Sequence, residues 1–509
     1  MNSDAFLRHH GLTANPFRAE EAREDSVFDR IESQCRHPDF HKILGDLEHA
    51  SSSVVFGERG SGKTAIRLQI EQVLLQREEA GGAAHRIWLV AYDDFNDLIS
   101  RFMQSLGDSD PDKALPKIKL VDHMDGILLR TVPQVMDGVF GERTEAPSFG
   151  KRSQIRKAFR LLTEETRRQL LRMQVCYDRP RSLAQRTRRL KRMLGLSGGS
   201  GIRTAKFASV ALAILGLAEI ITSWLYAARF GVDENLGFVP GAVLVVLAGY
   251  MAFRWFGIDW RVRRTAKRLQ KGIRVDERSP DTFKDALAEL RTTEWTAPEL
   301  PVGDSDSTRF TFFLALVRML RALGYESMMV LIDRLDEPTA INGDTRRMKS
   351  FIWPIFNNKF LQMPGVGFKL LLPLELRGEI MREREEFFRE ARLDKQHMIE
   401  RLIWSGPMLY DLCNTRFRAC LTADRRKQGE PSLMDLFSEE VYRQDLVDAI
   451  GELEQARDAF KFLYALIQEH CSNTTEEDGS FRITRPTLDL VRKRQVQRKE
   501  DMLRGQRPA

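Results

Sequence analysis

The chain has 509 residues, 42% of them hydrophobic, which is enough for two or three globular domains with their own cores. Its five cysteines are scattered without C-x-x-C spacing, which argues against a zinc site or a disulfide framework and fits a reducing compartment. The formal net charge is +7, but the excess of Lys and Arg is confined to segments 181–206 and 254–274, and the acidic remainder argues against a general nucleic-acid-binding surface.

The N-terminal region begins with MNSDAFLRHHGLTANPF, which lacks the apolar core segment of a signal peptide. We therefore expect the N-terminus to stay in the cytosol. The first predicted strand follows at 53–56, where the residues are mostly apolar and β-branched, as is typical of a buried parallel strand.

A phosphate-binding loop is predicted directly after this strand. The sequence GERGSGKT at 57–64 fits the pattern G-x-x-x-x-G-K-[ST], and a helix follows that directs its positive end toward an anion. In such a loop the backbone N–H groups surround phosphates, Lys63 reaches the β- and γ-phosphates, and the Thr64 hydroxyl holds Mg²⁺. The alternative is a glycine turn with an incidental lysine. The predicted nucleotide-binding residues are Gly57, Glu58, Arg59, Gly60, Ser61, Gly62, Lys63 and Thr64, and Lys63 is also a candidate catalytic residue.

After a second predicted strand at 85–95, a long insertion interrupts the α/β pattern. Its outer parts, 106–200 and 257–300, have apolar residues at helical spacing, and we expect them to form a helical stalk. Its central part holds two long apolar runs, 207–226 and 236–253. Both are long enough to cross a bilayer as helices, the second only just.

The charges beside these two runs predict their orientation. Lys and Arg concentrate on the cytosolic side of membrane spans, so both basic flanks should be cytosolic. The short link between the runs contains Arg229, Asp233 and Glu234, is not basic, and belongs on the far side. This predicts an inner-membrane protein with two spans and both termini in the cytosol. The alternative is a buried helical hairpin of a soluble core, which rarely carries such dense like-charge flanks.

One carboxylate, Glu219, lies inside the first apolar run. A charged carboxylate at this depth in a bilayer is unfavourable by about 3 kcal/mol unless it is paired or protonated. We hypothesise that Glu219 faces another subunit or a water-filled space. A protonated Glu tolerated within a helical bundle is the alternative.

The α/β pattern resumes with a helix at 307–324 and a strand at 328–333 that ends in Asp333. An acid at this place holds Mg²⁺ in nucleotide-binding sheets, so Thr64 and Asp333 are the predicted metal ligands. Asp336 and Glu337 follow, and either could orient the attacking water as a catalytic residue. Carboxylates also favour a solvated helix start, which is the alternative for both.

Three further elements complete the predicted fold. A helix at 345–360 precedes a strand at 367–376, at whose end Glu375 or Arg377 could contact the γ-phosphate, and a fifth strand is predicted at 395–404. The remainder is expected to be helical, with Cys413 and Cys420 on one helix face as core residues. The expected fold class is therefore an α/β parallel sheet of the phosphate-loop type, interrupted by the insertion and followed by a helical lid.

This layout resembles the KAP-type P-loop NTPases, membrane-associated relatives of the AAA+ and STAND ATPases with transmembrane helices between the phosphate loop and the metal-binding strand. The loop at 57–64 and the segment LIDRLDE carry the resemblance. GLTANPF also resembles the lead-in of secretion-associated AAA ATPases. EQARDAFKFLYALIQEH resembles the AAA+ lid helix that senses the γ-phosphate, which implies that Arg457 binds nucleotide. One position departs from the pattern, because AAA+ members have Glu directly after the metal-binding Asp and this chain has Arg334.

These patterns predict a chain organised in six segments. They are 1–105 (lead-in and first half of the nucleotide-binding core), 106–200 (helical insertion), 201–256 (transmembrane hairpin), 257–300 (helical return), 301–404 (second half of the core) and 405–509 (helical lid and basic tail).

The resemblance implies an ATPase that binds ATP and Mg²⁺ and acts as a nucleotide-driven membrane switch in signalling or defence. Two spans are too few for a pore in one chain, so any permeability change would need a homo-oligomer. A membrane-tethered, nucleic-acid-associated AAA+ ATPase is a second hypothesis, favoured only by the basic C-terminal tail at 492–507. A scaffold that binds ATP without turnover is a third, motivated by Arg334.

Overall fold

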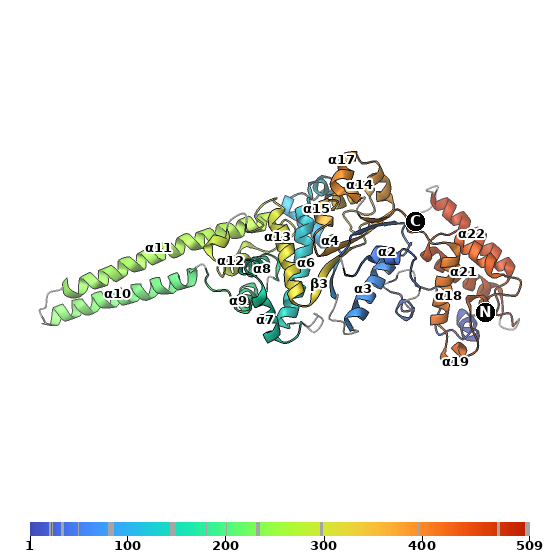
Figure 1. The fold of residues 1–509 in the computed structure, drawn as a ribbon, viewed down its shortest axis with the longest axis horizontal. Helices are drawn as coiled ribbons and strands as arrows, with labels where there is room; N and C mark the ends of the chain where they lie inside the picture. Colours follow the sequence, from blue (N-terminus) through green and yellow to red (C-terminus); the bar gives the residue numbers. More distant parts are fainter. Residues whose placement is uncertain are drawn as a thin grey trace. The chain divides into compact units, whose positions relative to one another are not determined.

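The computed structural model describes residues 1–19, 22, 24–31, 35–48, 50–79, 86–142, 149–179, 181–199, 201–230, 235–295, 299–393, 396–475 and 479–503. They form an α/β protein that is mostly helical and contains one five-stranded parallel sheet (Figure 1). The chain divides into two compact units. The sheet unit comprises 1–93, 329–349 and 356–509, and the helical unit comprises 94–328 and 350–355.

The sheet brings the predicted strands together in the order β2-β3-β4-β1-β5. Its central strand β1 pairs in parallel with β4 and with β5, so that Val55 lies opposite Leu371 and Ile399. The carboxyl ends of β1, β3 and β4 therefore meet at one edge, where the segments 58–64, 333–337 and 374–377 begin. All five predicted strands are present, but the fifth is only three residues long. The strands are β1 Ser53–Gly57, β2 Arg86–Tyr92, β3 Tyr325–Ile332, β4 Val366–Pro373 and β5 His397–Ile399.

The helices of the sheet unit pack in two hydrophobic clusters. One surrounds the sheet and contains Val55 of β1 and Ile66 of the helix that follows it. The other joins the N-terminal lead-in, through Phe6 and Phe17, to the C-terminal helices, where Cys413 and Cys420 are core residues as predicted. The helices are α1 Ser3–His9, α2 Phe40–Leu44, α3 Lys63–Glu79, α15 Asn358–Leu361, α16 Glu375–Met381, α17 Glu385–Ala391, α18 Gly406–Ala419, α19 Ala423–Arg426, α20 Arg443–Gly451, α21 Ala456–Asn473 and α22 Arg485–Leu503.

The helix predicted over 345–360 is wrong in its extent. Helix α14, Thr345–Ile352, ends before the short 3₁₀ turn Trp353–Ile355. Pro354 within this turn has no N–H group to continue the helical hydrogen bonds, and its ring clashes with the preceding turn. The chain becomes helical again only in α15.

A buried arginine fixes the lead-in against the C-terminal helices. Arg416 of α18 donates from Nε and Nη2 to the carbonyl oxygen of Pro16, at 2.9 and 2.7 Å, and its guanidinium forms an ion pair with Asp25. Both charged side chains are almost fully buried. Such charge-assisted bonds are stronger than neutral ones, so the lead-in is held as part of the C-terminal core.

The helical unit contains the insertion. Within the predicted helical insertion, helix α7 ends at Leu161 because Leu162 is extended, and Thr163 caps the next helix, α8, by accepting the N–H of Thr166 at 3.2 Å. Its helices are α4 Asn96–Leu106, α5 Pro111–Ala114, α6 Leu120–Phe140, α7 Arg152–Leu161, α8 Glu164–Tyr177, α9 Leu183–Met193, α10 Ile202–Phe230, α11 Asn235–Gly272, α12 Pro280–Leu287 and α13 Ser307–Ala322.

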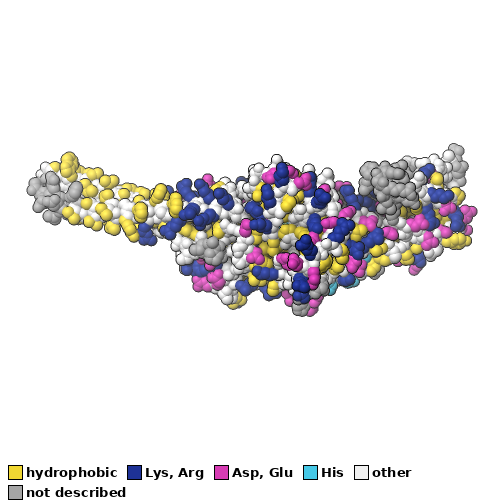
Figure 2. Space-filling model, turned by 90° about the horizontal axis from the view of Figure 1, so that it is seen from above, with side chains coloured by type: hydrophobic (Ala, Val, Ile, Leu, Met, Phe, Trp, Pro, Cys, Tyr) yellow, Lys and Arg dark blue, Asp and Glu magenta, His cyan; other side chains and the backbone are white. Residues whose placement is uncertain are grey.

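Helices α10 and α11 lie side by side and extend away from the rest of the helical unit (Figure 1). Both are long and apolar enough to cross a membrane, over Thr204–Tyr226 and Val239–Gly272. Only 11% and 17% of their most apolar stretches are buried, so a buried hairpin of a soluble core does not fit. Figure 2 shows hydrophobic side chains covering this pair of helices. Glu219 is exposed on α10, and Asp233 and Glu234 of the predicted link lie outside the described residues.

Buried ion pairs anchor the end of α11 within the helical unit. Arg309 of α13 donates from Nε and Nη2 to the two carboxylate oxygens of Asp125 on α6, both at 2.8 Å. Its Nη2 also donates to the carbonyl oxygen of Gly272 at 2.9 Å, and Arg274 donates to Asp122 at 2.6 and 2.9 Å. The two carboxylates of α6 are thus neutralised by Arg309 of α13 and by Arg274 just after α11, which fixes the three helices together.

Candidate nucleotide-binding site

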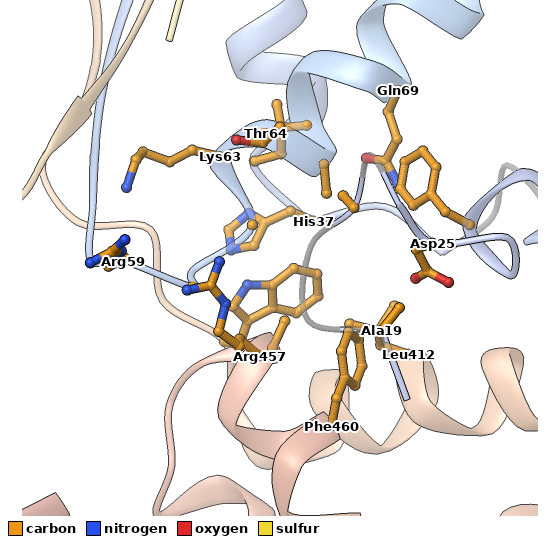
Figure 3. Close-up of a pocket in the computed structure, with 18 of the residues that line it drawn as sticks. Ala19, Asp25, His37, Arg59, Lys63, Thr64, Gln69, Leu412, Arg457 and Phe460 are labelled. Carbon is orange, nitrogen blue, oxygen red and sulfur yellow. The ribbon is translucent and has the colours of Figure 1, made fainter. Parts of the chain in front are cut away.

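The predicted site residues meet at the carboxyl edge of the sheet, which is where open α/β sheets bind ligands. A pocket of about 160 Å³ lies there, and residues that follow β1 and β3 line it together with residues of α21 (Figure 3). The predicted site residues that line the pocket are Arg59, Gly60, Gly62, Lys63, Thr64, Asp333, Asp336, Glu337 and Arg457. The predicted residues Gly57, Glu58 and Ser61 belong to the same loop but do not line it.

The loop between β1 and α3 depends on two glycines. Gly60 and Gly62 have φ angles of +95° and +100°, in the left-handed region that glycine adopts without steric strain. A Cβ atom on Gly60 would also lie 3.0 Å from the Cβ of Arg457. Residues outside the loop donate hydrogen bonds to two of its carbonyl oxygens. Trp404 Nε1 donates to the carbonyl oxygen of Ser61 at 2.7 Å, and the backbone N–H of Arg457 donates to that of Gly60 at 3.3 Å.

The ammonium group of Lys63 has only carbonyl partners. Its Nζ donates to the carbonyl oxygens of Gly57 and Glu58 at 2.7 and 2.9 Å, and none of the described carboxylates forms an ion pair with it. Burial lowers the pKa of Lys63, whereas the charges of Asp333 and Asp336 act in the opposite direction. A half-buried cation without a directly paired anion is well placed to bind a phosphate group.

Thr64 and Asp333 meet although 269 residues separate them. The Thr64 hydroxyl donates to Oδ2 of Asp333 at 2.9 Å, and Asp333 is 1% exposed. Burial raises the pKa of Asp333, while Arg67, itself paired with Glu71 and Asp93, favours its charged form. A hydroxyl and one carboxylate are the protein ligands that Mg²⁺ typically takes when phosphates and water complete its shell, so these residues fit the predicted metal.

The residues after Asp333 form a turn rather than a helix start. Arg334 has a φ angle of +63°, which is unusual for a residue other than glycine, and its guanidinium forms an ion pair with Glu337. Asp336 is half-buried and is one of the carboxylates whose charge raises the pKa of Lys63. Both candidate catalytic acids line the pocket, and they differ in that the charge of Asp336 acts on the pKa of Lys63 whereas Glu337 is paired with Arg334.

The two residues suggested after β4 differ in their surroundings. Glu375 is the first residue of α16, and its negative charge acts to raise the pKa of Lys63. Arg377 forms an ion pair with Glu400 at 2.5 Å and does not line the pocket. A direct role for Arg377 at a γ-phosphate is therefore not supported by its contacts.

The end of the pocket away from Lys63 combines apolar side chains with the ion pair of Asp25 and Arg416. Phe28 and Ile31 of the lead-in face it from one side, and Leu412 and Phe460 of the C-terminal helices from the other. Figure 3 shows Leu412 and Phe460 at this end, with Lys63 and Thr64 at the other. The pocket therefore has one end with the phosphate-binding loop and a second end where apolar side chains offer a surface to a larger group.

Several residues of this site left no signal in the sequence. Trp404 packs edge-on against His37, with ring centroids 4.8 Å apart, and His37 Nε2 donates to the carbonyl oxygen of Ile403 at 2.9 Å. Gln69 on α3 donates to the carbonyl oxygen of Cys35 at 3.2 Å. These contacts join segments far apart in the chain, so no local periodicity could reveal them. The only hint was the motif GLTANPF, which marked the lead-in.

Glu58 turns out of the phosphate-binding loop. Its Oε1 accepts from Arg401 at 2.6 Å, and its Oε2 accepts from Gln455. Arg401 also pairs with Glu454 at 2.9 Å, directly before α21. These contacts connect the loop to the C-terminal helices and direct the Glu58 carboxylate away from the place of a bound phosphate.

No protein-family model matches the chain, and neither a curated protein nor a solved structure matches it. The function proposed below therefore rests on the loop motif and on the geometry of the pocket.

Proposed function

We propose that the chain is a membrane-anchored, Mg²⁺-dependent P-loop ATPase that works as a nucleotide-driven, homo-oligomeric switch. The observation that carries this proposal is the hydrogen bond between Thr64 and Asp333 at the mouth of a strand–loop–helix motif that also presents Lys63. A glycine turn with an incidental lysine would have no reason to bring an acid from a distant strand to the adjoining hydroxyl.

Each residue has a definite part in this proposal. The backbone N–H groups of 57–64 and the N-terminus of α3 bind the phosphates, and the Lys63 ammonium neutralises them. Thr64 and Asp333 would hold Mg²⁺, which would supply positive charge beside the bound phosphates. Asp336 orients the attacking water and accepts its proton, and Arg457 contributes positive charge from α21.

The proposed switch rests on contacts between the loop and the C-terminal helices. Gly60 and Ser61 accept hydrogen bonds from Arg457 of α21 and from Trp404, which precedes α18. A bound phosphate that shifts the loop would therefore also shift α18 and α21. The likeness to KAP-type NTPases suggests that this motion serves signalling or defence, which is an argument by analogy.

The membrane part of the proposal rests on α10 and α11. Their apolar surfaces are exposed, and basic residues gather where both helices join the rest of the helical unit (Figure 2). This distribution supports an inner-membrane hairpin with both termini in the cytosol. Two helices do not enclose a pore, so an effect on permeability requires several copies.

The test uses the full chain purified in detergent. We expect Mg²⁺-dependent phosphate release by the wild type, a loss of at least 100-fold for Lys63→Ala, and a larger assembly in the presence of ATP that this variant does not form. Equal phosphate release and equal assembly states of the two proteins, with and without ATP, would overturn the proposal.

An ATP-binding scaffold without turnover is the second candidate. It is motivated by Arg334, which holds the position directly after Asp333 and engages Glu337, one of the two acids that could act on water. Tight ATP binding without phosphate release, unchanged in Asp336→Asn, would select the scaffold over the ATPase.

A further inference from the structure

Helix α11 carries a row of basic side chains beyond its apolar part. Its residues Ile258, Val262 and Leu269 are buried against the helical unit, and the opposite face is exposed and basic. We call this exposed row the basic stripe, and Figure 2 shows Lys and Arg gathered where the apolar surface ends. The basic stripe consists of Arg254, Arg261, Arg264, Lys267, Arg268 and Lys271.

The charges of the basic stripe are not neutralised within the described part of the chain. None of its six members has an ion-pair partner there, whereas the neighbouring Arg263 is paired with Asp259 at 2.7 Å. Elsewhere in the helical unit, Arg186 and Arg309 are satisfied by buried carboxylates. Like charges three and four residues apart repel one another along a helix, so the stripe is suited to an anionic partner outside the chain.

Aromatic rings mark the depth at which the stripe begins. Lys206 of α10 lies over the ring of Trp255 at 5.6 Å, and Arg264 lies over the ring of Trp260 at 5.4 Å. Tryptophan rings favour the boundary between hydrocarbon and headgroups. The start of the stripe therefore coincides with the expected surface of the bilayer.

The six residues of the basic stripe lie at different distances from the hydrocarbon core, and these distances divide the stripe into two halves of three residues. A hydrocarbon core about 30 Å thick takes about 20 residues at 1.5 Å each, which from Val239 ends near Ile258. Arg254 then lies about 6 Å inside the hydrocarbon, from where its long side chain reaches the headgroups, and Arg261 and Arg264 lie about 5 and 9 Å beyond the hydrocarbon, at headgroup depth. The other three lie about 14 to 20 Å beyond it, where salt screens most of their attraction to the surface.

We propose that Arg254, Arg261 and Arg264 form a binding site for the phosphate groups of anionic phospholipids. This inference rests on the membrane insertion proposed above and adds the class of lipid. Each cation near an anionic surface strengthens binding by about fivefold, so three together give a preference of about 100-fold. Nucleic acid is the less suitable polyanion, because the stripe adjoins a surface that belongs in lipid and the rest of the chain is acidic.

The experiment measures the binding of short-chain phosphatidylglycerol and phosphatidylcholine to the full chain in neutral detergent. The triple variant R254Q/R261Q/R264Q is compared with the matched variant K267Q/R268Q/K271Q, which removes the same charge from the same helix face. We expect the wild type to prefer phosphatidylglycerol, the first variant to lose most of this preference, and the second to stay within about threefold of the wild type. Inorganic phosphate at the same concentration should not compete.

Three results would overturn the inference. They are equal affinity of the wild type for both lipids, an equal loss in both triple variants, and displacement of the lipid by inorganic phosphate. Binding of a fluorescent DNA duplex that only the second variant loses would assign the stripe to nucleic acid instead. Detergent extraction from cell membranes tests insertion separately, so a chain that needs detergent but shows no lipid preference overturns this inference alone.

Discussion

The two acids that follow Asp333 differ in what surrounds them, and this difference predicts unequal roles. Both acids line the pocket, but the charge of Asp336 raises the pKa of Lys63, whereas Glu337 forms an ion pair with Arg334. We expect Asp336→Asn to lower the rate of phosphate release by about 100-fold or more, as removal of a general base does, and Glu337→Gln to change it by less than about threefold. ATP affinity should stay unchanged in both. The reverse order of the two rates would contradict the assignment of Asp336.

A buried lysine in β4 predicts a dependence of stability on pH. Lys369 is fully buried, donates to the carbonyl oxygen of Ser51 at 2.9 Å, and has its pKa lowered by burial to about 7 from 10.5. Between these values the unfolded chain binds more protons than the folded one, so stability rises with pH from about 7 to 10.5. Below pH 7 the full destabilisation remains, at about 1.4 kcal/mol for each pKa unit.

The variant Lys369→Met removes this buried charge. We expect its melting temperature to exceed that of the wild type most clearly at pH 6, and the difference to shrink as the pH rises toward 10. Thermal unfolding of both proteins across this range is the measurement. A difference that does not change with pH would show that burial does not lower the pKa of Lys369.

The site residues also show what a sequence can reveal at this scale. Lys63 and Thr64 were predictable because the loop motif has fixed spacing, and Asp333 because it ends an apolar strand. Trp404 and His37 were not, since their contacts join remote segments and depend on the tertiary fold. The ion pair of Arg334 with Glu337 was missed for another reason, because it lies in a turn where Arg334 has a positive φ angle, which arginine rarely adopts.

At the scale of helices, the pairing of α10 with α11 depends on two glycines. A Cβ atom on Gly216 would lie 2.9 Å from the carbonyl oxygen of Gly241, and one on Gly241 would lie 2.6 Å from Ile220. Small residues at such contacts let membrane helices approach closely. We expect Gly241→Leu to separate the helices and lower the melting temperature in detergent. Gly249→Leu is the control, because a Cβ there meets nothing within 4 Å, and an equal effect of both changes would refute the predicted contact.

The ion pair between Asp125 and Arg309 predicts a large loss of stability when it is broken. Both side chains are fully buried, and Arg309 also bonds the end of α11. We expect Arg309→Leu to destabilise the helical unit by about 3–5 kcal/mol, because it leaves a buried carboxylate without its partner. The double change Asp125→Leu with Arg309→Leu should be milder. Denaturant unfolding measures both, and a double variant that is less stable than the single one would contradict this explanation.

Helix positions were more predictable than helix ends. Both apolar runs at 207–226 and 236–253 lie within helices, because a long apolar stretch forms a helix in any apolar surrounding. Their ends were not predictable, since α11 continues to Gly272 as a helix with a buried apolar face and a basic one. The break at Pro354 could have been anticipated from its missing N–H group.

At the scale of the whole molecule, the alternation of strands and helices indicated an α/β sheet, but the order of its strands had no local signature. The order β2-β3-β4-β1-β5 follows from which strands pair, and pairing between buried apolar strands leaves no pattern in any one of them. The packing of the lead-in with the C-terminal helices, fixed by Arg416 and Pro16, joins opposite ends of the chain for the same reason.

The central claim is that the loop before α3 and the acid after β3 form one site for Mg²⁺ and ATP, and its most direct test is the affinity of the full chain for a fluorescent ATP analogue measured with and without Mg²⁺. We expect Mg²⁺ to strengthen binding to the wild type, Lys63→Ala to weaken binding under both conditions, and Asp333→Ala to bind equally with and without the metal. If Asp333→Ala responds to Mg²⁺ as the wild type does, the two segments do not share a nucleotide site and the account is wrong.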